Sequence, residues 1–533
     1  MSRLRRLFSD EGLTRKASLN AFAAILDYAS RLVAGFVMTP FLVRGLGDQG
    51  YGVWQILDRF MTYLSPATGR PSQALKWTIA RHQSSTDHED KRRQVGSALM
   101  VWLSFLPLLV GLGAVLAWAA PGLLKIPPSL AWSVRVATIV LVTNSLVFSL
   151  GDVPRSVLQG ENLGYKRMGF STALVFITAG LTALALYLQS GIVGVVLADL
   201  TGTVLGGALM FQVARTNIPW FGVARPAPGA MRRFLGLSGW FLAWNFVMRL
   251  MRATDVVVLG VFGSPEMVTM YTLTRYAPET VIFIVATLAQ GVTPGLGGIV
   301  GSGDKPRALR LRGEIMTFTW LLVATLGTTI LLWNRSLMQV WVGSRHYLGA
   351  VPNLLLMAMV AQFVLIRNDA NIIDLTLNLR RKVLLGFLSA ALAAAAAAYA
   401  VGVLGLGAVG LCVGFIAGRL ILSLGYPALV GRFLGVSLAQ QLRASLRPGI
   451  VTLLAFSLSA LGSRGLAAGS WWALAPGVAL TLPAAGFLAF RLGLGPQQRQ
   501  QVLRRLRRAL RGRSKDSSAG ADPENSIEGS RDI

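Results

Sequence analysis

The stretch MGFSTALVFITAGLTALALYL, residues 168–188, contains no charged residue. A run of about 20 apolar residues is long enough to cross a lipid bilayer as a helix. The hydrocarbon core offers no water to the backbone, so a spanning segment must satisfy its own N–H and C=O groups. The stretch therefore predicts a transmembrane helix.

The same pattern recurs on both sides of this stretch through most of the 533-residue chain. The predicted spans are residues 18–43, 53–80, 94–119, 133–158, 168–188, 191–213, 234–262, 269–300, 315–337, 347–375, 383–403, 408–429, 445–463 and 471–490. The sequence thus predicts an all-α, polytopic integral membrane protein with about 14 transmembrane helices.

The composition supports the membrane class and excludes others. Charged residues make up 14% of the chain and the mean hydropathy is +0.56, whereas soluble domains carry about 25% charged residues. The net charge of +28 is dispersed over loops and termini, so it does not form the basic face that a nucleic-acid partner needs. The single cysteine, Cys412, allows no internal disulfide.

Lysine and arginine are distributed unevenly between alternate loops. One set contains nearly all of them, and the opposite set contains Arg44, Lys125, Arg345 and Arg464. Basic loops face the cytoplasm. We therefore predict a multi-pass membrane protein with both termini in the cytoplasm.

The two halves of the chain repeat a pattern. Tyr28, Arg31 and Tyr51 recur as Phe246, Arg249 and Tyr271, at an offset of about 218 to 220 residues, and transporters built from repeats bind substrate between them. The predicted domains are a basic cytoplasmic segment (1–17), an N-lobe (18–213), a C-lobe (234–429), two additional helices (445–490), a basic amphipathic cytoplasmic helix (491–513) and a disordered tail (514–533).

Several short motifs carry a resemblance to a known family. They are TPFLVRGLG (39–47) followed by YGVW (51–54), VLQG (157–160) and DVVVLG (255–260) followed by Tyr271. In order and spacing they resemble the polysaccharide flippases (Wzx type) of the MATE-like MOP superfamily, which includes the MurJ lipid II flippases. The resemblance covers residues 18–429 and implies two six-helix lobes. It also implies transfer of an undecaprenyl-pyrophosphate-linked oligosaccharide from the inner to the outer leaflet by alternating access.

Intramembrane arginines are candidates for binding such an anionic lipid, because a guanidinium binds phosphate in a bidentate manner. The candidates for substrate binding are Arg31, Arg249, Arg59, Arg70 and Arg252, with Trp244 and Asn245 as sugar contacts. An Asp27–Arg31 pair on one helix face, and snorkelling of Arg135, Arg155 and Arg275 to the membrane surface, are the alternatives.

Buried carboxylates are candidates for proton or sodium coupling, namely Asp27, Asp255 and Asp58, with pairing to arginine as the alternative. The predicted partners are the lipid-linked oligosaccharide, membrane lipids, and a polysaccharide polymerase with its export machinery.

An enzyme is not expected. A glycosyltransferase or polymerase would need a sizeable outer loop with catalytic residues, and no cofactor motif or Walker-type loop occurs. A lipid II flippase and a multidrug or ion antiporter remain the alternatives among transporters.

Overall fold

The computed structural model describes residues 13–64, 71–81, 85–226, 230–301, 304–375, 379–500 and 502–503, and these contain no β-strand. The α-helices are α2 (Leu13–Leu64), α3 (Pro71–Arg81), α4 (His88–Leu123), α5 (Pro128–Gly160), α6 (Met168–Tyr187), α7 (Gly191–Asn217), α8 (Ala230–Phe262), α9 (Pro265–Gly301), α10 (Lys305–Trp341), α11 (Ala350–Leu375), α12 (Leu379–Gly402), α13 (Gly407–Leu434), α14 (Leu438–Gly462) and α15 (Trp471–Leu488). Short turns follow at η2 (Gly164–Arg167), η3 (Ser344–His346) and η4 (Ala489–Gly493).

Eleven helices in the described ranges are long and apolar enough to cross a membrane. Their surfaces expose large apolar side chains, including Trp118, Trp132, Leu458 and Leu480, as expected where lipid rather than water surrounds the protein. The predicted all-α, polytopic membrane class is confirmed, and the count of fourteen spans stays a prediction.

The first predicted span, 18–43, and the start of the second, 53–80, are the two helical segments of α2. The segments meet at a kink at Gly47, where the backbone is not helical. Gly47 has φ 69° and ψ 171°, and glycine adopts this left-handed conformation without a steric penalty from a β-carbon. The kink redirects the helix and starts its second half at Asp48.

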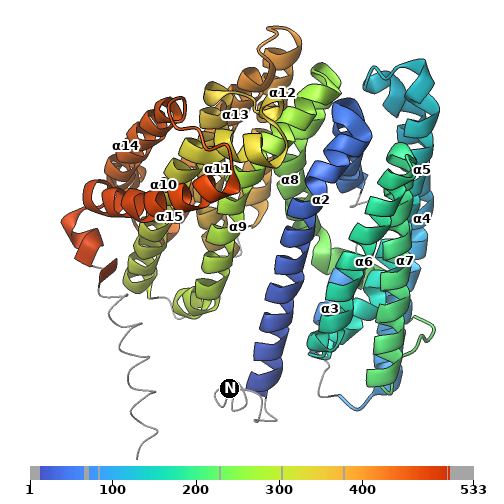
Figure 1. The fold of residues 1–533 in the computed structure, drawn as a ribbon. Helices are drawn as coiled ribbons and strands as arrows, with labels where there is room; N and C mark the ends of the chain where they lie inside the picture. The colour runs from blue at the N-terminus through green and yellow to red at the C-terminus, as the bar shows by residue number, and fades with distance from the viewer. Residues whose placement is uncertain are drawn as a thin grey trace, which may run out of the picture. The chain divides into compact units, whose positions relative to one another are not determined.

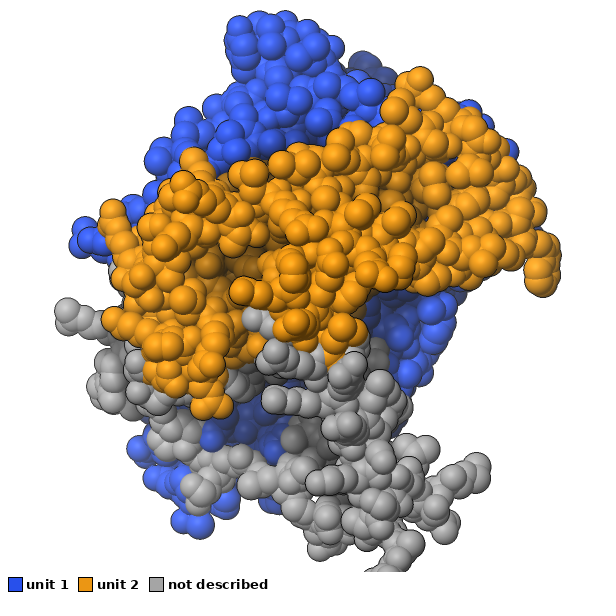
Figure 2. All heavy atoms as spheres, turned by 90° about the vertical axis from the view of Figure 1, so that its left-hand side faces the viewer, with its two compact units in different colours: residues 1–276, 335–359, 378–422 blue, residues 277–334, 360–377, 423–533 orange. Residues whose placement is uncertain are grey.

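The chain forms two compact units, which Figure 2 distinguishes by colour. Unit 1 comprises residues 1–276, 335–359 and 378–422, and unit 2 comprises 277–334, 360–377 and 423–533. This division follows packing and is not the predicted division into an N-lobe (18–213) and a C-lobe (234–429). The two repeated lobes therefore stay a prediction.

Unit 1 contains a layer of long helices. Helices α4, α5, α6 and α7 lie side by side, and α2 packs against α5, α6, α7 and α8 (Figure 1). Its largest apolar cluster includes Ile56 and Leu57 of α2, Leu259 of α8 and Phe415 of α13. Residues far apart in sequence therefore share one core.

Unit 2 is held together partly by polar contacts. Arg312 of α10 makes a bidentate ion pair with Asp369 of α11, with Nε–Oδ1 and Nη2–Oδ2 distances of 2.9 and 3.0 Å. The indole Nε1 of Trp333 donates to Thr481 Oγ1 of α15 at 2.9 Å. Of the predicted basic tail helix (491–513), residues 491–493 belong to η4, residues 496–500 and 502–503 are helical, and residues 501 and 504–513 lie outside the described residues.

Candidate functional site

A cavity of about 430 Å³ lies within unit 1 between α2, α5, α6 and α7. Its lining alternates polar and charged side chains with apolar and small ones. The lining residues are Arg31, Asn144, Phe148, Gly151, Asp152, Arg155, Arg167, Ser171, Leu174, Val175, Thr178, Asp199, Gly202, Thr203, Gly206, Gly207 and Met210. Two of its charged residues, Asp152 and Asp199, lie on neighbouring helices, α5 and α7.

Glycines on α7 set how closely the walls of this cavity approach. A β-carbon at Gly202 would lie 2.2 Å from Thr178 Oγ1 of α6, and one at Gly206 would lie 2.8 Å from Leu174 Cδ2. On the other side, a β-carbon at Gly151 of α5 would lie 3.0 Å from the Cα of Gly207. Small residues allow membrane helices to pack backbone to backbone, and here they bring three polar helix faces together.

Three arginines reach this cavity from three different elements. Arg31 of α2 lies 3.7 Å from Asp27, and Arg155 of α5 lies 3.9 Å from Asp152. Arg167, at the end of η2, donates from Nη1 to Ser171 Oγ at 3.4 Å. Both ion pairs are long, so neither guanidinium has its hydrogen-bonding capacity filled by its carboxylate.

Deeper along α5 and α7, Asn144 and Asp199 form a second polar contact. The Asn144 amide donates to Asp199 Oδ2 at 2.6 Å. Asn144 lies 11 residues before Arg155 on the same helix, which corresponds to a rise of roughly 16 Å. The cavity is therefore polar over about half the thickness of a bilayer core.

Some buried polar atoms at this site have no hydrogen-bond partner among the described residues. They are Asp27 Oδ1, Asn144 Oδ1 and Arg167 Nε. A buried polar atom without a partner costs free energy unless water or a ligand binds it. The cavity is thus suited to hold water or a polar group that donates to the two oxygens and accepts from Arg167.

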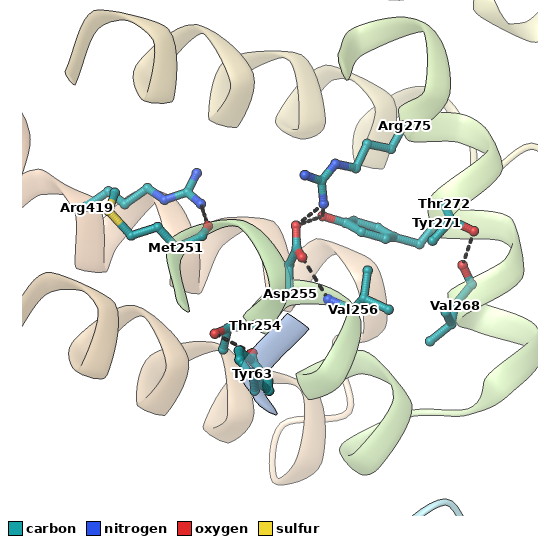
Figure 3. A network of polar contacts seen from close by, with 10 residues as sticks. All are labelled: Tyr63, Met251, Thr254, Asp255, Val256, Val268, Tyr271, Thr272, Arg275 and Arg419. Carbon is teal, nitrogen blue, oxygen red and sulfur yellow. Dashed lines mark hydrogen bonds and ion pairs between the residues drawn. The ribbon is translucent and has the colours of Figure 1, made fainter. Parts of the chain in front are cut away.

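A second polar cluster surrounds Asp255 in unit 1. Asp255 of α8 is fully buried; Tyr271 of α9 donates to its Oδ2 at 2.8 Å, and Arg275 forms a close ion pair with the same oxygen. Figure 3 shows this group, with Arg419 of α13 turned toward the Met251 carbonyl, which accepts from it at 2.6 Å. The charge of Asp255 is therefore balanced by the Arg275 side chain.

Solved structures of two kinds of membrane transporter resemble this chain. No protein-family model matches the chain, and no curated protein matches it in sequence. A structure of the lipid II flippase MurJ in an inward closed conformation gives a TM-score of 0.62 at 14% identity, covering 88% of this chain and 99% of that one. An inward-facing multidrug resistance MATE transporter of the MOP superfamily gives 0.60 at 13% identity, covering 84% and 100%. The chain has the MOP-superfamily fold.

The fold implied by the sequence motifs is thereby confirmed, and the Wzx-type family stays a prediction. A MATE structure in complex with MaD5 gives a lower TM-score of 0.53 at 14% identity over 80% of this chain and 97% of that one. Identities this low show the fold and leave the substrate open.

Within this MOP-superfamily fold, the predicted binding residues are dispersed. Arg31 lines the cavity, whereas Arg249 is half-buried on α8 and donates to the Thr62 carbonyl at 3.1 Å. Arg59 is half-buried with its Nε unpartnered among the described residues, and Arg252 is exposed. Arg70 and the side chains of Trp244 and Asn245 lie outside the described residues.

The proposed coupling residues also differ from one another. Asp255 is paired with Arg275, Asp58 is exposed, and Asp27 adjoins the cavity through its contact with Arg31. Asp255 is thus paired with an arginine, as the alternative reading of the sequence had it. Arg275 is buried and does not extend to the membrane surface.

Arg167 was not among the residues predicted to bind substrate. In the sequence it follows Lys166 in a short basic loop before an apolar stretch. The η2 turn places Arg167 one helical turn before Ser171, at the cavity. No local signal distinguishes such a residue from any other basic residue in a loop.

Proposed function

We propose that this protein is a flippase that moves a polyprenyl-pyrophosphate-linked oligosaccharide from the inner to the outer leaflet of a bacterial plasma membrane. The lipid would be of the undecaprenyl type, and the oligosaccharide a repeat unit of a surface polysaccharide. Transport would proceed by alternating access without enzymatic chemistry, and a polymerase and export machinery would use the product.

The observation that carries this proposal is the convergence of Arg31, Arg155 and Arg167 on one cavity. A pyrophosphate offers several oxygens with a fixed spacing, and the planar guanidinium binds two such oxygens at once. The carboxylates of Asp27 and Asp152 balance two of these charges when no substrate is bound. Substrate phosphate would compete for the arginines.

The geometry of the guanidiniums favours a lipid-linked anion over a cationic drug. MurJ and MATE proteins share the fold, so the fold alone supports lipid II flipping and multidrug or ion antiport as alternatives. The three arginines are balanced by Asp152 and Asp199 in the cavity lining and by Asp27 beside it, so the preference for phosphate rests on bidentate hydrogen bonding and not on net charge. A lipid II flippase remains the second candidate, since its substrate is also an anionic lipid-linked sugar.

For the energy source, we propose coupling to a proton or sodium gradient at Asp27. Its Oδ1 is buried without a partner among the described residues, next to the cavity. Asp255 is less suited, because Arg275 already supplies its cation. A charge exchanged at Asp27 would change how strongly Arg31 binds substrate phosphate.

The test is polysaccharide export in a strain that lacks the gene and carries plasmid-borne variants. We expect Arg155→Ala and Arg167→Ala to lower surface polymer on the order of tenfold or more each, since a hydrogen bond to a charged group contributes about 1.5–3 kcal/mol. Arg→Lys variants should retain part of the activity, because lysine keeps the charge and loses the bidentate geometry.

A matched control lies on the same helix as Arg155. Arg135 of α5 is exposed and does not line the cavity, so Arg135→Ala should export polymer at the parental level. Membrane levels of every variant are measured by immunoblot. Parental export by the Arg155→Ala and Arg167→Ala variants would contradict the head-group role. If the parent protein binds undecaprenyl pyrophosphate and does not bind a cationic dye, the antiporter alternative is contradicted.

A further inference from the structure

Three chain connections meet at one end of unit 1. They are the kink of α2 at Gly47, the α8–α9 connection at residues 263–264 and the α10–α11 connection at residues 342–349. Thr269 Oγ1 of α9 donates to the Asp48 carbonyl at 2.5 Å, and the Asp48 carboxylate contacts His346 of η3. The sequence predicts all three connections on the outer side of the membrane.

His346 is held at this end by both ring nitrogens. Nε2 lies 2.7 Å from Asp48 Oδ1, and Nδ1 lies 2.9 Å from the Val342 carbonyl oxygen. The residue is 2% exposed, so water does not replace either partner. Both partners are acceptors, and an imidazole has two N–H donors only when it is protonated. A neutral ring would leave one lone pair facing an oxygen.

The other charged groups around His346 do not substitute for it. Arg345 lies 3.7 Å from the same Asp48 oxygen, but its side chain is largely exposed, and exposed ion pairs contribute little. Helix α9 faces the site with neutral hydroxyls, Thr269 on the Asp48 carbonyl and Thr274 on the His346 carbonyl. The other titratable or charged residues near this site along the chain are Arg44 and Tyr51 on α2, Glu266, Tyr271 and Arg275 on α9, Tyr347 in the α10–α11 connection, Arg335 on α10 and Arg367 on α11.

This contact lies above a tight junction between α2 and two other helices. Trp341 of α10 stacks on Phe36 of α2 with ring centroids 4.8 Å apart, and its Nε1 donates to the Phe36 carbonyl at 2.9 Å. A β-carbon at Gly52 would lie 1.9 Å from the Pro265 carbonyl oxygen. Movement of α2 away from α9 and α10 at this end would break the Asp48–His346 contact together with the Thr269 and Trp341 hydrogen bonds.

We propose that Asp48 and His346 form a proton-operated latch at this end of the helices. A proton on His346 completes the two hydrogen bonds and holds α2 to the α10–α11 connection. Loss of the proton removes one of them and also removes the positive charge that faces the Asp48 carboxylate, which weakens the hold on the kinked end of α2. The latch is separate from the arginine cavity, and it would make opening at the predicted outer side depend on external pH.

The protonation state can be read directly, because the chain has three histidines, His82, His88 and His346. Replacing His82 and His88 by asparagine leaves His346 as the only imidazole in full-length protein. Nitrogen NMR of protein labelled at the imidazole, recorded over a series of pH values, should show both ring nitrogens protonated at the acidic end and one proton lost at the basic end. A ring with one protonated nitrogen throughout the series would overturn the proposal.

The opening can be measured without any substrate by spin labels at two exposed positions, Arg44 on α2 and Val351 on α11. Both are changed to cysteine in a Cys412→Ala background. We expect one short-distance population at the acidic end of the same pH series and a longer, broader one at the basic end.

Variants identify the group responsible. His346→Gln and Asp48→Asn should each give the same distance distribution at both ends of the series, because the charged contact is missing. His88→Asn, at an exposed residue of α4, should keep the pH-dependent change. A distribution that is independent of pH in the parent, or that still changes with pH in His346→Gln, would overturn the latch.

Discussion

The charged residues of this protein differ in how closely each one is paired with an opposite charge. Asp255 is fully buried and would be costly as an isolated carboxylate, yet Arg275 and Tyr271 bind the same oxygen. Arg31 instead has a distant partner in Asp27, at 3.7 Å, and an exposed side chain at a cavity. A close buried pair is suited to hold helices together, whereas a loose pair at a cavity is suited to bind a ligand.

Removal of one member of the buried pair should therefore affect folding before transport. Asp255→Asn leaves the Arg275 charge buried without its partner, and breaking such a pair costs about 3–5 kcal/mol. We expect a strong loss of monodisperse protein in detergent, measured by fluorescence-detected size exclusion after heating. The double variant Asp255→Asn with Arg275→Met removes both charges and should recover most of the stability. An Asp255→Asn protein as stable as the parent would show that the pair is not structural.

At the scale of elements, close helix contacts rest on small residues. Gly414 and Gly418 of α13 lie one turn apart and face α12, where a β-carbon on either would lie 2.5 Å from Ala397 N or 2.3 Å from Ala393 Cα. The Ser389 hydroxyl of α12 donates to the Gly418 carbonyl at 3.0 Å. Lipid gives no hydrophobic drive for helix association, so backbone contact of this kind stabilises the pair.

The α12–α13 contact predicts a difference between two adjacent positions. Gly418→Ile would force the helices apart, and overpacking costs about 1–3 kcal/mol, so the apparent melting temperature should fall by several degrees. Ala417→Ile places the same side chain one residue away on the exposed face of α13 and should leave melting unchanged. Equal melting of the two variants would mean that the close approach does not contribute to stability.

At the scale of the whole molecule, the described contacts agree with the predicted membrane topology. The connections near Asp48, Ser264 and His346 belong to the set of loops poor in lysine and arginine, and contacts of Asp48 with α9 and η3 bring them to one end of unit 1. Loops predicted on the same side of the membrane thus lie together. Which side that is follows from the positive-inside rule.

Reporter fusions test the orientation directly. We expect a reporter that is active only in the cytoplasm to be active when fused after Lys16 and after Arg513, because the basic loops alternate as the rule requires. A reporter active only outside, placed at the same two positions, should be silent. Opposite activities at the two ends would require an odd number of spans and would refute the fourteen-span topology.

The sequence by itself determined the membrane class, the helical architecture and, through its motifs, the superfamily fold. Hydropathy is a local property, and the bilayer sets the length of every spanning segment. Tertiary structure alone decided the partners. The repeat related Arg31 to Arg249, but only Arg31 lines the cavity, while Arg155 and Arg167 join it from other elements. His346 meets Asp48 across 298 residues, because such contacts depend on how helices pack and leave no periodic signal in the sequence.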